Sequence, residues 1–82
     1  MRKDPIDMIH VKIRLFATLR ENRDKETVIE LSEGAAVKDI LERLDISRED
    51  AAIILINGRG AKLDRILEDN DIVSIFPPLG GG

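Results

Sequence analysis

One amphipathic segment constrains the fold of this chain more than any other feature. Over residues 37–44, apolar side chains recur at spacings of three, four and seven, which is typical of a helix with a single apolar stripe. The stripe consists of Val37, Ile40, Leu41 and Leu44, and charged residues stand between these positions. Because strand-like segments precede and follow it, this helix is expected to cover one face of a sheet.

The segment before the helix predicts a hairpin. Residues 9–15 alternate apolar and polar side chains, which indicates a half-buried strand. A polar stretch separates this strand from residues 26–31, which carry a second set of apolar side chains. Antiparallel pairing of the two segments is the simplest interpretation.

The segment after the helix predicts a second set of strands. Residues 51–56 are continuously apolar, as expected of a strand that is covered on both faces or central in a sheet. Asn57-Gly58 then signals a hairpin turn, with a short return strand over residues 59–63. A single helical turn or an apolar plug is expected at Ile66-Leu67, and residues 72–76 form the last strand.

This order of elements predicts the topology. A helix that connects two hairpins crosses one face of a single sheet, and the right-handed crossover preference places the first and last strands side by side in parallel. We therefore expect an α+β fold of the ubiquitin-like β-grasp type, a mixed sheet of four to five strands with one main helix on one face. Residues 1–8 are expected to be a flexible leader, residues 9–76 the domain and residues 77–82 a flexible tail.

Composition narrows the possible functions. The net charge of −3 makes nucleic acid a poor partner, and the absence of cysteine leaves no thiolate nucleophile or thiolate metal site. We found no secretory signal and no apolar run of membrane-spanning length, so a cytoplasmic protein without a membrane partner is expected.

The tail carries the strongest functional signal. Pro77 and Pro78 fix the backbone angle φ and end strand pairing, and the chain then runs to Gly80, Gly81 and Gly82. Glycine has no Cβ, so a terminal glycine carboxylate is open to adenylation or to attack by a nucleophile, and the tail can enter a narrow channel. At roughly 3.3 Å per residue, the tail would extend about 20 Å from the domain. The alternative is a frayed chain end without chemistry.

Other candidate residues have simpler explanations. The single histidine, His10, is predicted on the outward face of the first strand, where a solvated histidine is the more common case. Acidic pairs such as Glu68-Asp69 lack the spacing of a calcium loop, so no metal site is expected. The two aromatic residues, Phe16 and Phe76, end strands that are expected to be neighbours, so they form either a docking patch or part of the core.

Several short motifs together resemble the MoaD/ThiS family of sulfur carriers. They are Arg-Leu-Phe-Ala followed by Leu-Arg-Glu, then Val-Lys-Asp-Ile-Leu, Ile-Asn-Gly, Asp-Asn-Asp-Ile-Val and the ending Phe-Pro-Pro-Leu-Gly-Gly-Gly. The likeness covers residues 9–82, and its ending is more similar to the small subunit of molybdopterin synthase than to the thiamine-pathway carrier. Two departures are Asn70, where the family usually has glycine, and the additional Gly80.

The resemblance implies a carrier that is not catalytic alone. An adenylating enzyme of the ubiquitin-activating type, using ATP and magnesium, would activate the carboxylate of Gly82, and a sulfur donor would convert it to a thiocarboxylate. The large subunit of molybdopterin synthase would then receive the tail, and the isolated chain would bind no cofactor. Partner contacts are implied for Phe16 and Phe76 and for Gly81 in the threaded tail. Pro77, Pro78 and Gly80 are also expected to contact partners, with the two prolines directing the tail and Gly80 loosening it.

Three alternatives stay open at this point. The chain could be a ubiquitin-like modifier that is joined to target lysines through Gly82. It could be the sulfur carrier for thiamine thiazole synthesis. It could also be a β-grasp interaction module without chemistry at its C-terminus.

Overall fold

The structure, a computed structural model, describes residues 8–78 of the chain. The strands in this range are β1 (Met8–Leu15), β2 (Glu26–Ser32), β3 (Ile53–Ile56), β4 (Arg59–Gly60) and β5 (Ile72–Phe76). The helices are the α-helix α1 (Val37–Leu44) and a 3₁₀ helix, η2 (Ala17–Arg20).

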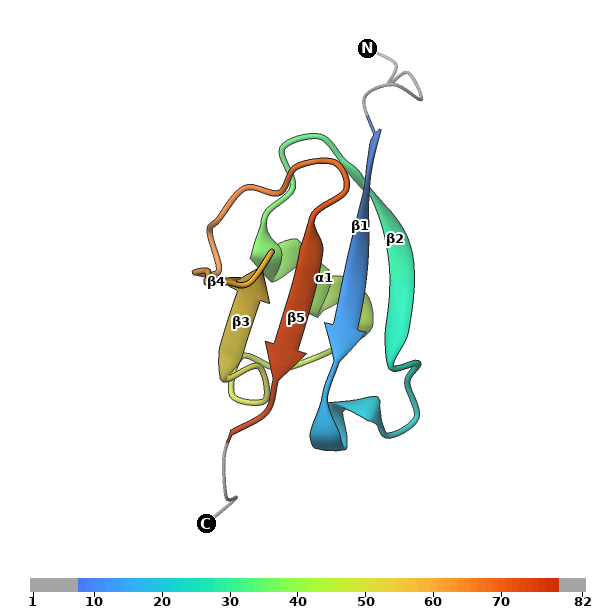
Figure 1. Cartoon of the computed structure of the whole chain (residues 1–82), viewed down its shortest axis with the longest axis vertical. Coiled ribbons are helices and arrows are strands. Elements are labelled where there is room, and N and C mark those ends of the chain that lie inside the picture. Colours follow the sequence, from blue (N-terminus) through green and yellow to red (C-terminus); the bar gives the residue numbers. More distant parts are fainter. Residues whose placement is uncertain (1–7, 79–82) are drawn as a thin grey trace.

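The strands form one mixed sheet in the order β2-β1-β5-β3-β4. β1 and β5 pair in parallel at its centre, and every other pairing is antiparallel. In Figure 1, α1 passes behind the sheet and covers one of its faces. This arrangement confirms the predicted β-grasp fold, including the parallel pairing of the first and last strands.

The core lies between the sheet and α1. Apolar residues alternate along β1, so the side chains of Ile9, Val11, Ile13 and Leu15 are buried, while His10 and Arg14 are exposed on the other face. The predicted helical stripe meets this surface. Val37, Ile40 and Leu41 are buried and Leu44 is half-buried. The expected amphipathic pattern therefore builds the core.

The ends of α1 are set by local contacts. The carboxylate of Asp39 accepts a hydrogen bond from the backbone N–H of Ala36 at 2.8 Å, which satisfies a donor at the start of the helix. At the other end, Asp45 adopts the left-handed conformation (φ 57°, ψ 46°) and stops the helix. These contacts confine the helix to eight residues.

The predicted hairpin turn at Asn57-Gly58 is present, with positive φ at both residues (52° and 87°), as a type I′ turn requires. The Asn57 side chain also reaches the turn before β5. Its Nδ2 group donates to Asp71 Oδ1 at 2.9 Å, and its Oδ1 atom accepts from the N–H of Ile72 at 3.0 Å. Asp71 is only 5% exposed, and this contact gives its buried carboxylate a donor.

Some expectations need correction. Of the two expectations for residues 51–56, the interior position in the sheet is correct, because β3 lies between β5 and β4. Cover on both faces is wrong: Ile53 is 44% exposed and Leu55 is half-buried, because α1 shields only one side of the sheet. The return strand is limited to Arg59–Gly60. At Ile66-Leu67 there is no helical turn. Leu67 is the buried plug, and Ile66 is exposed.

Two boundaries also differ from the sequence prediction. β1 begins at Met8, one residue earlier than expected. The 3₁₀ helix η2 was not predicted, and it buries Leu19 against the core. Within residues 8–78, no helix is long and apolar enough to cross a membrane.

We expect Ile13→Ala to lower the free energy of unfolding by about 2–5 kcal/mol, because Ile13 is fully buried in the core. Urea unfolding followed by circular dichroism measures this change. The matched control is Val28→Ala, on the neighbouring strand, where the side chain is 59% exposed and a loss of about 1 kcal/mol or less is expected. Equal losses for the two variants would contradict the assignment of the buried face.

Candidate functional site

The candidate site lies where β5 ends and the tail begins. Pro77, directly after β5, is half-buried, and Pro78 is exposed. The predicted tail glycines, Gly80, Gly81 and Gly82, lie outside the described residues. The structure therefore describes the root of the tail and the surface around it.

Phe16 and Phe76 lie against each other at this root. Their ring centroids are 4.2 Å apart and the ring planes differ by 10°, so the rings are stacked. Both residues are half-buried, and neither belongs to the buried core cluster. The parallel pairing explains the contact, because Phe16 follows β1 and Phe76 ends β5 at the same end of the sheet.

Backbone hydrogen bonds hold both residues in place. The N–H of Phe16 donates to the carbonyl of Ile75 at 3.2 Å, and the carbonyl of Phe76 accepts from the N–H of Ala52 at 3.0 Å. The carbonyl of Phe16 accepts from Leu19 within η2. The stack is thus fixed to the end of the sheet by contacts on both sides.

Apolar surface continues from the stack onto β3. Ile53 is the register partner of Phe76, and Leu55 faces Ser74 two residues further along the same strand pair. Together with Phe16 and Phe76, Ile53 and Leu55 form an apolar patch on the open face of the sheet, which we call the root patch. Ile53 was missed as a site residue, because an apolar run alone does not show which of its side chains stays uncovered.

Two guanidinium groups flank the root patch. The guanidinium carbon of Arg14 lies 5.7 Å from the centroid of the Phe16 ring, and that of Arg20 lies 5.4 Å from it. Both distances fall within the range of cation–π attraction. The Nε group of Arg20 also donates to the carbonyl of Leu15 at 2.8 Å, which orients its side chain.

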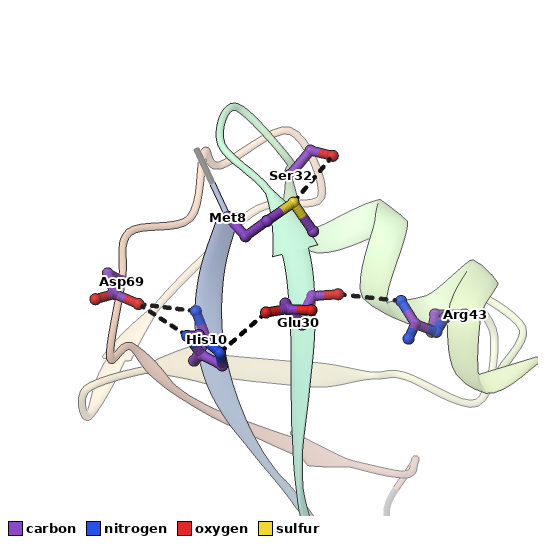
Figure 2. A network of polar contacts seen from close by, with 6 residues as sticks. All are labelled: Met8, His10, Glu30, Ser32, Arg43 and Asp69. Carbon is purple, nitrogen blue, oxygen red and sulfur yellow. Dashed lines mark hydrogen bonds and ion pairs between the residues drawn. The ribbon is translucent and has the colours of Figure 1, made fainter. Parts of the chain in front are cut away.

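The predicted exposure of His10 is confirmed, and Figure 2 shows its surroundings at the start of β1. Its Nε2 atom lies 3.2 Å from a Glu30 carboxylate oxygen and its Nδ1 atom 3.8 Å from Asp69 Oδ1. The same Asp69 oxygen accepts the backbone N–H of His10 at 2.8 Å. Arg43 of α1 donates to the backbone carbonyl of Glu30 at 3.2 Å. These contacts tie β1 to β2 and to the turn before β5.

The acidic pairs do not gather around a common point in the described part of the chain. Between residues 8 and 78, no group of three or more histidine, aspartate or glutamate side chains is arranged to hold a metal ion. The candidate functional site is therefore the root of the tail, at the opposite end of β1 from His10.

Comparison with known proteins shows the family of this chain. The chain matches the ThiS family over residues 13–82, a range that includes the root patch and the glycine tail. This chain belongs to the ThiS family. Membership confirms the resemblance that the sequence motifs indicated.

Three individual proteins are similar to this ThiS-family chain. It is 32% identical to small archaeal modifier protein 3 from Haloferax volcanii, over 90% of this chain and 100% of that protein. Among solved structures, it is similar to small archaeal modifier protein 1 from Haloferax volcanii, with 25% identity, a TM-score of 0.75 and coverage of 87% and 99% of the two chains. A Pyrococcus furiosus protein provisionally assigned as molybdopterin converting factor subunit 1 shares 34% identity, with a TM-score of 0.71 and the same coverage.

A double-mutant cycle tests the stack. We expect Phe16→Ala and Phe76→Ala to show a coupling free energy of about 0.5–1.5 kcal/mol, because removal of either ring removes the same contact. Urea unfolding of the two single variants, the double variant and the parent protein provides the four values. A coupling of zero within error would mean that the rings do not pack on each other in solution.

Proposed function

We propose that this protein is a sulfur carrier that acts as the small subunit of molybdopterin synthase. In this proposal the carboxyl group of Gly82 is adenylated, converted to a thiocarboxylate, and used to donate sulfur in the biosynthesis of molybdopterin. ATP and magnesium belong to the adenylating enzyme, and the chain supplies the reacting carboxylate. Membership of the ThiS family and the similarity to the Pyrococcus furiosus protein support this function.

The position of the root of the tail is the observation that carries the proposal. The Phe-Pro-Pro-Leu-Gly-Gly-Gly sequence begins at the last residue of β5, which pairs with β1 on one side and β3 on the other. A strand held on both sides gives the tail a fixed origin on the domain. The rings of Pro77 and Pro78 restrict φ, so the chain leaves this origin in a restricted direction.

Activation is needed because a carboxylate is a poor electrophile. Attack of the Gly82 carboxylate on the α-phosphorus of ATP would give a mixed anhydride and release pyrophosphate, and a sulfur nucleophile would then displace AMP to leave the thiocarboxylate. The absence of side chains at the last three positions leaves this carbon accessible. The folded domain would contribute binding and orientation, not chemistry.

The root patch is the surface by which both partners would hold the domain. An enzyme that admits the tail also covers the residues at its root, where Phe16, Phe76 and Ile53 present apolar surface. Aromatic residues are enriched among those that dominate binding energy in protein interfaces. We therefore propose that the adenylating enzyme and the large synthase subunit bind the root patch in turn.

Intact mass spectrometry tests the carrier function. After incubation with the adenylating enzyme of the source organism, ATP, magnesium and a sulfur donor, we expect the mass to rise by the exchange of one oxygen atom for one sulfur atom. Removal of Gly81 and Gly82 should abolish this change, because the new terminal carboxylate, that of Gly80, lies two residues closer to the domain and would no longer reach the adenylation site.

Gly60→Ala is the matched glycine control for this experiment. Gly60 lies in β4 without positive φ, and a Cβ atom added there meets nothing within 4 Å. We expect this variant to gain sulfur like the parent protein. An unchanged mass for the parent protein, with the enzyme shown to be active on another carrier, would contradict the proposal.

A second function, protein modification, is favoured by the names of two relatives. Both are small archaeal modifier proteins, so Gly82 of this chain is also a candidate for isopeptide bonds to target lysines. Residues 66–82 contain no lysine or arginine, so trypsin would leave this whole segment on a modified lysine. Branched peptides that carry residues 66–82, found in cells that express the protein, would establish modification. Their absence, together with the thiocarboxylate, would leave the carrier function alone.

A further inference from the structure

A small hollow lies beside the Phe16–Phe76 stack. Its volume is about 280 Å³, and it is lined by Arg14, Phe16, Arg20, Lys25 and Glu26. Arg14 lies in β1, Arg20 in η2 and Glu26 at the start of β2, while Phe16 follows β1 and Lys25 directly precedes β2. The carbonyl of Leu15 accepts from Arg20 Nε at 2.8 Å, and the N–H of Leu15 donates to the carbonyl of Lys25 at 2.8 Å. The walls of the hollow are therefore held by hydrogen bonds.

The hollow is basic although the protein is acidic overall. Three cationic side chains and one carboxylate line it, whereas the chain carries a net charge of −3. Arg14 Nε lies 3.5 Å from the carboxylate of Glu26. In the described part of the chain, neither Arg20 nor Lys25 forms an ion pair. The hollow thus has positive charge that the folded domain does not neutralise.

The donors of these cations are available to a ligand. Arg14, Arg20 and Lys25 are all exposed. Over residues 8–78, the Nη groups of Arg20 and the Nζ group of Lys25 have no hydrogen-bond partner, although Arg20 is oriented through its Nε group. A guanidinium group held over an aromatic ring presents its N–H groups in a plane, which suits the two oxygens of a carboxylate.

We propose that this hollow binds an acidic segment, with aspartate or glutamate side chains, of the adenylating enzyme that receives the tail. This proposal rests on the proposed function. The hollow shares Phe16 with the root patch, so a protein that covers the root of the tail also reaches Arg20 and Lys25. Charge complementarity then selects the partner: apolar contact with the stack supplies affinity, and carboxylates in the hollow set orientation and the rate of encounter.

Enzyme kinetics with charge-reversed carriers test the proposal. We expect Lys25→Glu and Arg20→Glu each to raise the KM for the carrier about tenfold with kcat within about twofold, because docking is weakened and the tail chemistry is unchanged. Lys25→Glu is the cleaner variant, since its side chain donates no hydrogen bond within residues 8–78. The KM of the adenylating enzyme for the unchanged carrier should also rise with salt concentration, because ions screen the attraction between exposed charges.

Lys38→Glu is the matched control. Lys38 is exposed on α1, on the side of the sheet opposite the open face, so the same change of net charge should leave KM within about twofold of the parent value. Circular dichroism verifies that each variant is folded. Equal effects of Lys38→Glu and Lys25→Glu would overturn the proposal, since only net charge would then matter.

A measurement without the tail chemistry separates this proposal from the proposed function. Titration of the labelled protein with a hexaglutamate peptide should shift the amide resonances of Arg14, Phe16, Arg20 and Lys25 at low salt, and Lys25→Glu should reduce the shifts. Shifts produced by inorganic phosphate but not by the peptide would overturn the proposal in favour of a small-anion site. Peptide binding without thiocarboxylate formation would contradict the proposed function alone. Normal adenylation with an unchanged KM for both Lys25→Glu and Arg20→Glu would contradict only the docking of an acidic segment.

Discussion

The parallel pairing of β1 with β5 is the contact on which the rest of the structure depends. It places the first and the last strand of the domain side by side at the centre of the sheet, although some sixty residues separate them in the sequence. Phe16 and Phe76 meet because these two strands end together. The tail leaves from this point, so its root, the aromatic stack and the basic hollow all lie at one end of the sheet.

A second constraint is that one helix covers only one face. The side chains of α1, β1, β3 and β5 that meet between the layers form a closed aliphatic core. The other face keeps charged residues along β1 and apolar residues on β3 and β5, with Ile72 39% exposed and Ile53 more so. A domain of this size therefore separates its two tasks: one side of the sheet stabilises the fold, and the other side is free for contact with partners.

Local patterns predicted much of this structure. Three features could be predicted because they depend on spacing or on a positive φ that few residues adopt. They are the alternation along residues 9–15, the apolar stripe of α1 and the Asn57-Gly58 turn. The resemblance of short motifs also led to the correct family. Position along the chain identified Phe16 and Phe76 as neighbours, because the topology itself could be inferred.

Other features depend on packing between distant segments and were not predicted. The 3₁₀ helix η2 starts at Ala17 with φ of 53°, a conformation that alanine does not signal. The exposure of Ile53 follows from its register with Phe76, which a continuous apolar run cannot reveal. The hollow depends on two hydrogen bonds to Leu15 of β1, one from the Arg20 side chain to the Leu15 carbonyl and one from the Leu15 N–H to the backbone carbonyl of Lys25. Each of these features is set by a contact and not by a local pattern.

The central position of β5 has a mechanical consequence. A load applied to the tail along the axis of β5 is parallel to the strands β1 and β3 that pair with β5. The hydrogen bonds of both pairings then lie across the direction of the pull. Such a load shears several hydrogen bonds at once, whereas a load on an edge strand pulled sideways opens them singly. Resistance to force is governed by the rate of unfolding under that load. The domain is consequently expected to resist traction applied at the end of the sheet from which the tail leaves.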